Sequence, residues 1–192
     1  GIASAHDIIR FKHPVSPEDI VPDTLPRALW LDEIDGVALT AYVQDHPATL
    51  RFTRPGVVKT LHVDGASVTV TWQCAGLAGR RFATRLNLAM PSCDGFLGRY
   101  VMADGSIPGG FGTPLDLPEA SVLTLEDGVL GGSIRLAASI PAEICGRPQQ
   151  TVSQSEAGFE KIMQGVELSF LWTVPDDRST LQLQLTTQQS AT

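Results

Sequence analysis

The sequence predicts an all-β fold, an antiparallel β-sandwich in which helices contribute little or nothing. Apolar and polar residues alternate along most of the chain with the two-residue period of strands that are buried on one face. Asp-Gly pairs separate several of these runs, and such pairs are the strongest short-range signal of a β-hairpin. No stretch of ten or more residues holds a helical period. A chain of 192 residues is long enough for one well-packed core, so we expect residues 1–192 to form a single domain.

The first part of the chain holds one helical signal and two predicted hairpins. The run SPEDIV places Ser16 as an N-cap before two acidic residues, which predicts a single helical turn. Asp35-Gly36 then joins ALWLDEI to VALTAYV, and Asp64-Gly65 joins VVKTLHV to SVTVTWQ. We expect each pair to form the two central residues of a type I′ turn, because both positions of that turn need positive φ.

The second half of the chain repeats the strand pattern. Alternation continues in RFATRLNLAM, in SIRLAASI, in GVELSFLWTV and in LQLQL. Asp127-Gly128 is expected to join the run SVLTLE to the run VLGGSIRL through a third tight hairpin. Glycine and proline separate the runs at about the spacing that antiparallel strands require.

One segment fits neither a strand nor a helix. Residues 91–118 read PSCDGFLGRYVMADGSIPGGFGTPLDLP, which is rich in glycine and proline and too long for a simple connection. Ordered loops of this length in compact domains usually have a function. Phe96, Tyr100 and Phe111, together with Val101 and Met102, offer apolar anchors, so we expect an ordered flap that lies over one sheet.

Composition and charge exclude some classes of partner. The formal charge of -7 and the pI near 5.0 argue against a nucleic acid or an anionic membrane, because both need clustered Lys and Arg. No window approaches the run of about 18 apolar residues that spans a bilayer. Cys74, Cys93 and Cys145 are odd in number and form no CxxC pair, which predicts free thiols in a reducing compartment. We therefore expect a cytoplasmic protein that binds neither nucleic acid nor membrane.

Motifs of common catalytic and cofactor sites are missing from the sequence. There is no GxSxG nucleophile elbow, and the four histidines never fall at HxH or HxxxH spacing. The glycine-rich run GSIPGGFG is not followed by the Lys-Ser or Lys-Thr pair of a phosphate-binding loop. His62 lies within an alternating run and is read as a strand residue in preference to a metal ligand. We expect no metal ion, no cofactor and no catalytic residue in this chain.

Polar and aromatic side chains of the kind that contact sugars remain. Aromatic rings stack on the apolar faces of pyranoses, and amides and carboxylates bridge hydroxyl groups. Asn87 shares a strand face with Arg85; if that face is buried, both side chains need partners, which a ligand or a neighbouring domain could provide. Tryptophan in an alternating strand is more often a core residue. The candidate carbohydrate-binding residues are Asn87, Gln154, Glu156, Glu160, Trp72 and Trp172, and Trp30 and Gln164 belong to the same inventory.

Residues 151–165, TVSQSEAGFEKIMQG, carry a family resemblance. With the preceding AEICGRP and the following VELSFLW, this segment resembles a signature in the C-terminal domain of α-amylase/4-α-glucanotransferase-type enzymes of glycoside hydrolase family 57. In that signature a Thr-Val-Ser-Gln-Ser-Glu-Gly-Gly-Phe-Glu run leads into Gln-Gly, and Ala157 stands here in place of the first glycine. The runs RLNLAM and DGASVTVTW resemble two further strands of the same domain.

The resemblance implies a β-supersandwich of the galactose-mutarotase-like kind that follows a catalytic (β/α) barrel acting on α-1,4-glucans. The nucleophile and the acid of the family lie in that barrel, so the resemblance assigns no catalytic residue to this chain. It implies that the chain is the C-terminal part of a longer α-amylase/4-α-glucanotransferase-type glycosidase. The implied partners are that catalytic barrel and an α-glucan or oligosaccharide.

Three functions are compatible with these residues. We expect a non-catalytic accessory domain that packs on the barrel and helps to hold a glucan. An independent carbohydrate-binding module would need exposed aromatic rings, and the chain has only 3 Trp and 2 Tyr. A mutarotase-like sugar isomerase would use His62 with Glu156 or Glu160 as acid and base. Within TVSQSEAGFEKIMQG itself, Gly158 is expected to let the chain turn and Phe159 to pin the bend to the core.

Overall fold

The structure, a computed structural model, describes residues 15–90, 92–93, 97–155 and 158–189. Every strand pair in these ranges is antiparallel, which confirms the predicted all-β antiparallel class. No helix of the described part is long and apolar enough to cross a bilayer. The elements are η1 (Pro17–Ile20), β1 (Leu29–Ile34), β2 (Val37–Ala38), β3 (Val43–Gln44), β4 (Arg51–Arg54), β5 (Val57–Asp64), β6 (Ser67–Cys74), β7 (Arg81–Leu88), β8 (Gly98–Met102), β9 (Gly109–Gly110), β10 (Leu115–Asp127), β11 (Gly132–Ser155), β12 (Gly158–Thr173) and β13 (Thr180–Gln189).

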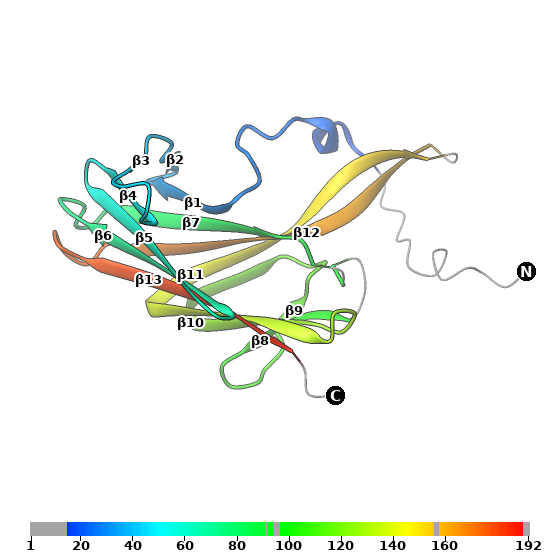
Figure 1. Cartoon of the computed structure of the whole chain (residues 1–192). Helices are drawn as coiled ribbons and strands as arrows, with labels where there is room; N and C mark the ends of the chain where they lie inside the picture. Colours follow the sequence, from blue (N-terminus) through cyan, green and yellow to red (C-terminus); the bar gives the residue numbers. More distant parts are fainter. Residues whose placement is uncertain (1–14, 91, 94–96, 156–157, 190–192) are drawn as a thin grey trace, which may run out of the picture.

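The long strand β11 belongs to both layers of the sandwich. Strands follow one another in the order β2-β1-β7-β12-β11-β13-β6-β5-β4-β3, and β10 pairs with the other side of β11. Residues 132–138 of β11 pair with β13, and residues 143–155 pair with β12. Between these two parts, the Ser139 hydroxyl accepts the N–H of Gln182 at 3.0 Å, and Pro141 has no N–H to donate. The sheet therefore folds over at residues 139–141, with β1, β7 and β12 in one layer and β13, β6 and β5 in the other (Figure 1).

Aromatic rings from the two layers meet in the core. The ring centroid of Trp72 on β6 lies 5.6 Å from that of Phe82 on β7 and 6.1 Å from that of Trp172 on β12. Strand β6 forms no ladder with β7 or β12, so these contacts join the layers face to face. All three side chains are buried, because alternate residues of each strand point towards the opposite layer.

The Asp35-Gly36 hairpin is confirmed. Ile34 pairs with Val37, so Asp35 and Gly36 are the two central residues of the turn. Their φ angles are 50° and 78°, as a type I′ turn requires.

The other two Asp-Gly turns differ from the prediction. Asp64 is itself paired, so Gly65, with φ of 54°, and the residue after it form the two-residue turn. Asp127 is also the last paired residue of its strand, and a four-residue loop follows in which Gly131, with φ of 61°, takes the left-handed conformation. In both hairpins the aspartate of the Asp-Gly dipeptide is a strand residue, and a single glycine supplies the positive φ that the turn needs.

The glycine-rich segment adds two strands to an edge of the sheet, so the prediction that it is neither strand nor helix is wrong. Strand β8 pairs with β10, and β9 pairs with β8. Tyr100 and Phe111 are fully buried and pack edge to face at a centroid distance of 5.2 Å. A Cβ at Gly98 would lie 2.3 Å from the ring of Phe111, so glycine is needed for this packing. Phe96, the other predicted aromatic anchor, lies outside the described residues.

Candidate functional site

The two tryptophans predicted to stack on sugars lie in the core. Trp72 is 0% exposed and Trp172 is 2% exposed. Trp172 donates its indole N–H to the carbonyl of Ile140 at 3.2 Å, and its ring lies against Phe170 and Phe82. No face of either ring is open to a pyranose in this structure, because β6 and β12 turn these side chains towards the opposite layer. Trp30 is half-buried and packs on Trp72 at a centroid distance of 6.2 Å.

Trp72 is part of a buried charged cluster. The Oδ2 atom of Asp32 accepts hydrogen bonds from the Trp72 indole (3.0 Å) and the Tyr42 hydroxyl (2.8 Å), and it lies 2.9 Å from Nζ of Lys59. The Oδ1 atom accepts from the Thr84 hydroxyl at 2.8 Å. Burial and then the charge of Asp32 raise the pKa of Tyr42 far above its ordinary value, so the phenol remains a donor. The cluster joins β1, β5, β6 and β7, and its carboxylate has both oxygens occupied, so its chemistry is structural.

A small hollow, lined by both polar and apolar side chains, lies where β7, β12 and β11 meet the segment that precedes β1. Asn87 on β7, Gln149 on β11, Gln164 on β12 and Arg27 on the preceding segment line a hollow of about 210 Å³. We call this hollow the amide groove. A Cβ at Gly165 would lie only 2.3 Å from the carbonyl oxygen of Leu88, so glycine is needed where β12 approaches β7 at this hollow. The remaining lining residues are Leu88, Ala89, Gly165 and Val166.

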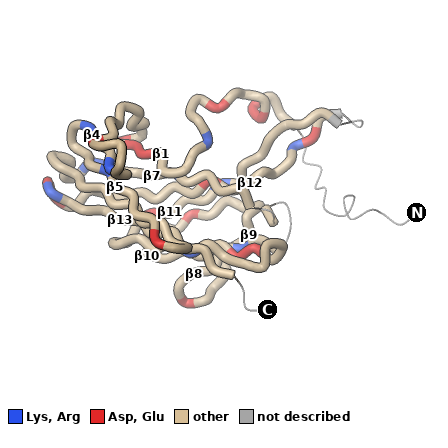
Figure 2. The backbone as a smooth tube through the Cα atoms, viewed as in Figure 1, with Lys and Arg blue, Asp and Glu red and all other residues tan. Residues whose placement is uncertain are grey.

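A second hollow of about 410 Å³ adjoins the amide groove and shares Arg27 and Gln149 with it, and this second hollow is polar. Its walls carry both signs of charge. Arg27 pairs with Asp23 at 2.6 Å, and Arg85 pairs with Glu33 at 2.5 Å. Figure 2 shows acidic residues along the segment before β1 that covers this side of the sheet. The second hollow has an excess of acidic groups, because Glu18, Asp19, Asp23 and Glu167 line it together with two basic residues, Arg27 and Arg85.

The amide groove can hydrogen-bond a neutral ligand that is rich in hydroxyl groups. Amide side chains donate and accept, and the Arg27 guanidinium donates. Asn87 has already donated to the carbonyl of Ala28 at 3.1 Å, which fixes its orientation in the wall. No aromatic ring is among the described residues that line the two hollows, so such a ligand would be held by hydrogen bonds and not by stacking.

The other predicted sugar-binding residues lie apart from Asn87. Gln154 is exposed near the tip of the β11–β12 hairpin, where it pairs with Phe159. It is five residues beyond Gln149, or about 16 Å along the strand, so it does not reach the amide groove. Glu160 is 6% exposed, and Glu156 lies outside the described residues. Phe159 is 68% exposed, so the prediction that it pins the bend to the core is wrong; the hairpin extends beyond the sheet, and this ring lies near its tip.

His62 and Glu160 lie on different layers. His62 is an exposed residue of β5 and pairs with Thr69. Glu160 belongs to β12, which is separated from β5 along the ladder by β11, β13 and β6. The structure therefore does not bring His62 and Glu160 together as the acid and base of a mutarotase-like reaction; Glu156, the alternative partner of His62, lies outside the described residues.

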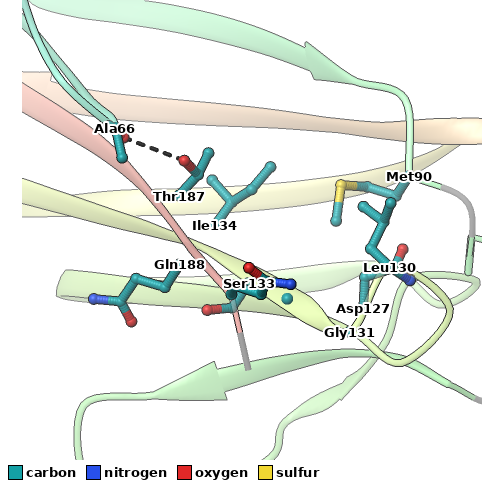
Figure 3. A pocket seen from close by; sticks show the side chains of 11 residues that line it. Ala66, Met90, Asp127, Leu130, Gly131, Ser133, Ile134, Thr187 and Gln188 are labelled. Atoms are coloured by element: carbon teal, nitrogen blue, oxygen red, sulfur yellow. Dashed lines mark hydrogen bonds between the residues drawn. The ribbon is translucent and has the colours of Figure 1, made fainter. Parts of the chain in front are cut away.

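A further hollow of about 470 Å³ opens beside the loop between β10 and β11 (Figure 3). Asp127 in its wall accepts hydrogen bonds from the N–H and hydroxyl of Ser92 and from the N–H groups of Val129 and Leu130, at 2.5 to 3.0 Å. Burial raises the pKa of Asp127, but these hydrogen bonds outweigh it and the net pKa is lowered. The carboxylate thus holds the loop and is not available to a ligand.

The sequence did not predict the roles of Arg27 and Gln149, and it did not predict the buried charged cluster. Arg27 precedes the first strand in a segment without periodicity, and Gln149 sits in a polar run that gives no sign of its neighbours. Lys59 did leave a signal, because it alternates with Val57 and Leu61 on the apolar face of its strand. An inward lysine needs a buried anion.

Comparison with known proteins agrees with the resemblance in residues 151–165. The family model described as alpha-amylase/4-alpha-glucanotransferase, C-terminal, matches residues 1–185. Among solved structures, 4-alpha-glucanotransferase from Thermococcus litoralis is similar at a TM-score of 0.58 and 18% identity, over 89% of this chain and 29% of that one. The present chain thus spans less than a third of that glucanotransferase.

A second solved structure is less similar to this chain. The Slr1438 protein from Synechocystis sp. PCC 6803 has a TM-score of 0.44 and 11% identity, over 88% of this chain and 65% of that one. No curated protein matches the sequence significantly. Because the family model spans nearly all of the sequence, the chain belongs to the family of C-terminal domains of alpha-amylases and 4-alpha-glucanotransferases.

Proposed function

We propose that this chain is a non-catalytic accessory domain of an α-glucan-acting glycosidase or glucanotransferase. It packs on the catalytic barrel of its parent polypeptide and holds part of a glucan chain in the amide groove. The observation that carries the second part is the convergence of Asn87, Gln149, Gln164 and Arg27 from four separate segments on one hollow. The family supplies the class of substrate.

The chemistry of the groove suits a neutral polysaccharide. A glucan offers many hydroxyl groups and no charge, and side-chain amides both donate to and accept from hydroxyl groups. Each such hydrogen bond contributes only about 0.5 to 1.5 kcal/mol net, so a groove without aromatic rings would bind weakly. Weak binding fits a domain that assists a catalytic site on the same polypeptide, where the effective concentration of the glucan is high.

The test is titration calorimetry of the full-length protein with maltooligosaccharides, with its catalytic site blocked by a competitive inhibitor. The double substitution Asn87→Ala with Gln164→Ala removes two amides. It should lower the affinity for maltooligosaccharides, measured with the catalytic site blocked, about tenfold or more. Gln182→Ala is the matched control, because it removes an exposed amide from the other layer. Absence of heat at millimolar ligand, or equal affinity of the double variant and the control, would contradict the glucan site.

Gln154, Glu156 and Glu160 remain predicted glucan contacts outside the amide groove. The double substitution Gln154→Ala with Glu156→Ala, measured in the same titration, separates this second contact from the first. The cytoplasmic location also stays a prediction. Its support is the odd number of cysteines, Cys74, Cys93 and Cys145, and the lack of a CxxC pair among them.

A further inference from the structure

The hairpin formed by β11 and β12 continues beyond the sandwich. Strand β10 leaves β11 after Gly146, and β7 joins β12 only from Val166. Residues 147–155 of β11 and 158–165 of β12 therefore form ladders with each other and with no other strand of the described chain. We call these two stretches the arm, which projects from one end of the sandwich in Figure 1.

The arm has the properties of an element that is covered in the intact protein. A two-stranded ribbon is marginally stable by itself in water, and each free strand edge can pair with another chain. Natural proteins protect exposed edges with charged side chains, but residues 149–155 of the arm read QQTVSQS and carry no charge. Within the described part of the chain, no strand pairs with this uncharged edge, so we expect a partner to cover it.

An apolar anchor lies near the tip of the arm. Phe159 is 68% exposed and stands directly opposite Gln154, so their side chains lie on the same face of the ribbon. Exposed aromatic residues of this kind are enriched in protein interfaces, where they fill pockets of the partner. The neighbouring polar groups would form the rim of such a contact.

We propose that the arm is the docking element for the catalytic domain of the same polypeptide, with Phe159 inserted into the surface of that domain. The inference deepens the proposed function and rests on it, because it takes the catalytic domain as the partner. The occupant follows from the family, since this domain is the C-terminal one and the related glucanotransferase chain is much longer.

The path of the chain supports this choice of occupant. The segment that leads into β1 lies beside the arm, where the Asp19 carboxylate pairs with Lys161 of β12 at 2.8 Å. The polypeptide thus enters the sandwich on the same side as the arm. The amide groove lies at the base of the arm, because Gln149 and Gln164 belong to both. A catalytic domain docked on the arm would therefore stand next to the groove, and one glucan chain could reach both.

Photo-crosslinking of the full-length protein tests the occupant. Phe159→p-benzoylphenylalanine should form cross-links to residues of the catalytic domain within the same polypeptide, as identified by peptide mass spectrometry. The matched control places the same residue at Val129, an apolar residue that is 62% exposed on the β10–β11 loop, and should give no such cross-link. Cross-links that double the molecular mass would identify a second copy as the occupant and overturn the proposal. Cross-links to added maltooligosaccharide alone would also overturn the proposal.

Hydrogen exchange of the full-length protein supplies the second measurement. Phe159→Ala should increase the exchange rate of amides in residues 147–155 about tenfold or more, as expected when an interface anchor is removed. Val129→Ala should leave these rates unchanged. Equal rates in both variants, together with no cross-link to the catalytic domain, would overturn the docking role. Loss of glucan binding at the groove with the cross-link retained would overturn the proposed glucan site and leave the arm assignment intact.

Discussion

Asp32 and Lys59 bring opposite charges into the interior from the two layers of the sandwich. Their side chains are 0% and 9% exposed, and the ion pair is completed by hydrogen bonds to Asp32 from three other side chains. A buried pair of this kind contributes little net stability compared with apolar residues, but the removal of one partner leaves an uncompensated charge. The pair therefore fixes which face of β1 meets which face of β5.

Asp32→Asn should lower the free energy of unfolding by about 3 to 5 kcal/mol, because Lys59 would keep its charge in a buried site without a counterion. Urea denaturation followed by circular dichroism measures the change. Asp23→Asn is the control, since the exposed Asp23–Arg27 pair should contribute little to stability. Adding Lys59→Met to the Asp32 variant should restore part of the loss. A single variant as stable as the control would contradict this role.

Residue roles were predictable only where a strand pattern fixed them. Alternation placed Trp72 and Trp172 on apolar faces, and the tendency of strand tryptophans to be core residues proved the better guide than their affinity for sugars. Asn87 was predicted to contact a ligand or a neighbouring domain because its strand face also carries Arg85. That face borders the amide groove and the second hollow. The partners of Asn87 in the amide groove come from distant segments, and no local pattern announces them.

At the scale of the elements, alternation predicted the strands, but their lengths and partners came from the assembled sheet. The hairpin turns illustrate this, because two of the three Asp-Gly pairs have the aspartate in the strand and not at the centre of the turn. Strand β11 is 24 residues long and changes partner at residues 139–141. That exchange depends on where β12 and β13 lie, so the sequence of β11 alone does not reveal it.

Gly165→Ala should separate β12 from β7 and lower the free energy of unfolding by about 2 to 3 kcal/mol, because overpacked backbone cannot relax by a rotamer change. The new Cβ would meet the carbonyl oxygen of Leu88 at 2.3 Å, which is far inside contact distance. Gly112→Ala is the control, since a Cβ there would meet only Met163 Sδ at 3.9 Å. Thermal unfolding of the two variants measures the difference, and equal melting temperatures would refute the steric requirement.

The whole molecule is held together by contacts between its layers. Trp72, Phe82 and Trp172 come from three strands in two layers, so neither layer buries its apolar face without the other. The sandwich class was predictable from alternation and turn signals, since half-buried strands must cover one another. If residues 1–192 form a single domain, they should unfold cooperatively, and this can be measured.

Tryptophan fluorescence and far-ultraviolet circular dichroism should report the same unfolding midpoint in urea, because the rings lie between the layers. Phe82→Ala should shift both midpoints together, with a loss of about 3 to 5 kcal/mol. Val129→Ala is the control and should have little effect on the stability of the sandwich, because that side chain is 62% exposed. Two separate transitions would show that the layers unfold independently and that residues 1–192 are not one cooperative unit.

The pairing of β6 with β13 also has a consequence for the synthesis of the protein. Ser67 and Thr186 face each other in this ladder although 119 residues separate them along the chain. At a translation rate of 5 to 20 residues per second, β6 waits about 6 to 24 s on the ribosome before its partner strand is made. During that interval the hairpin of β5 and β6 has an open edge and an uncovered apolar face. The nascent chain should therefore bind chaperones until β13 has emerged and has covered the edge of β6.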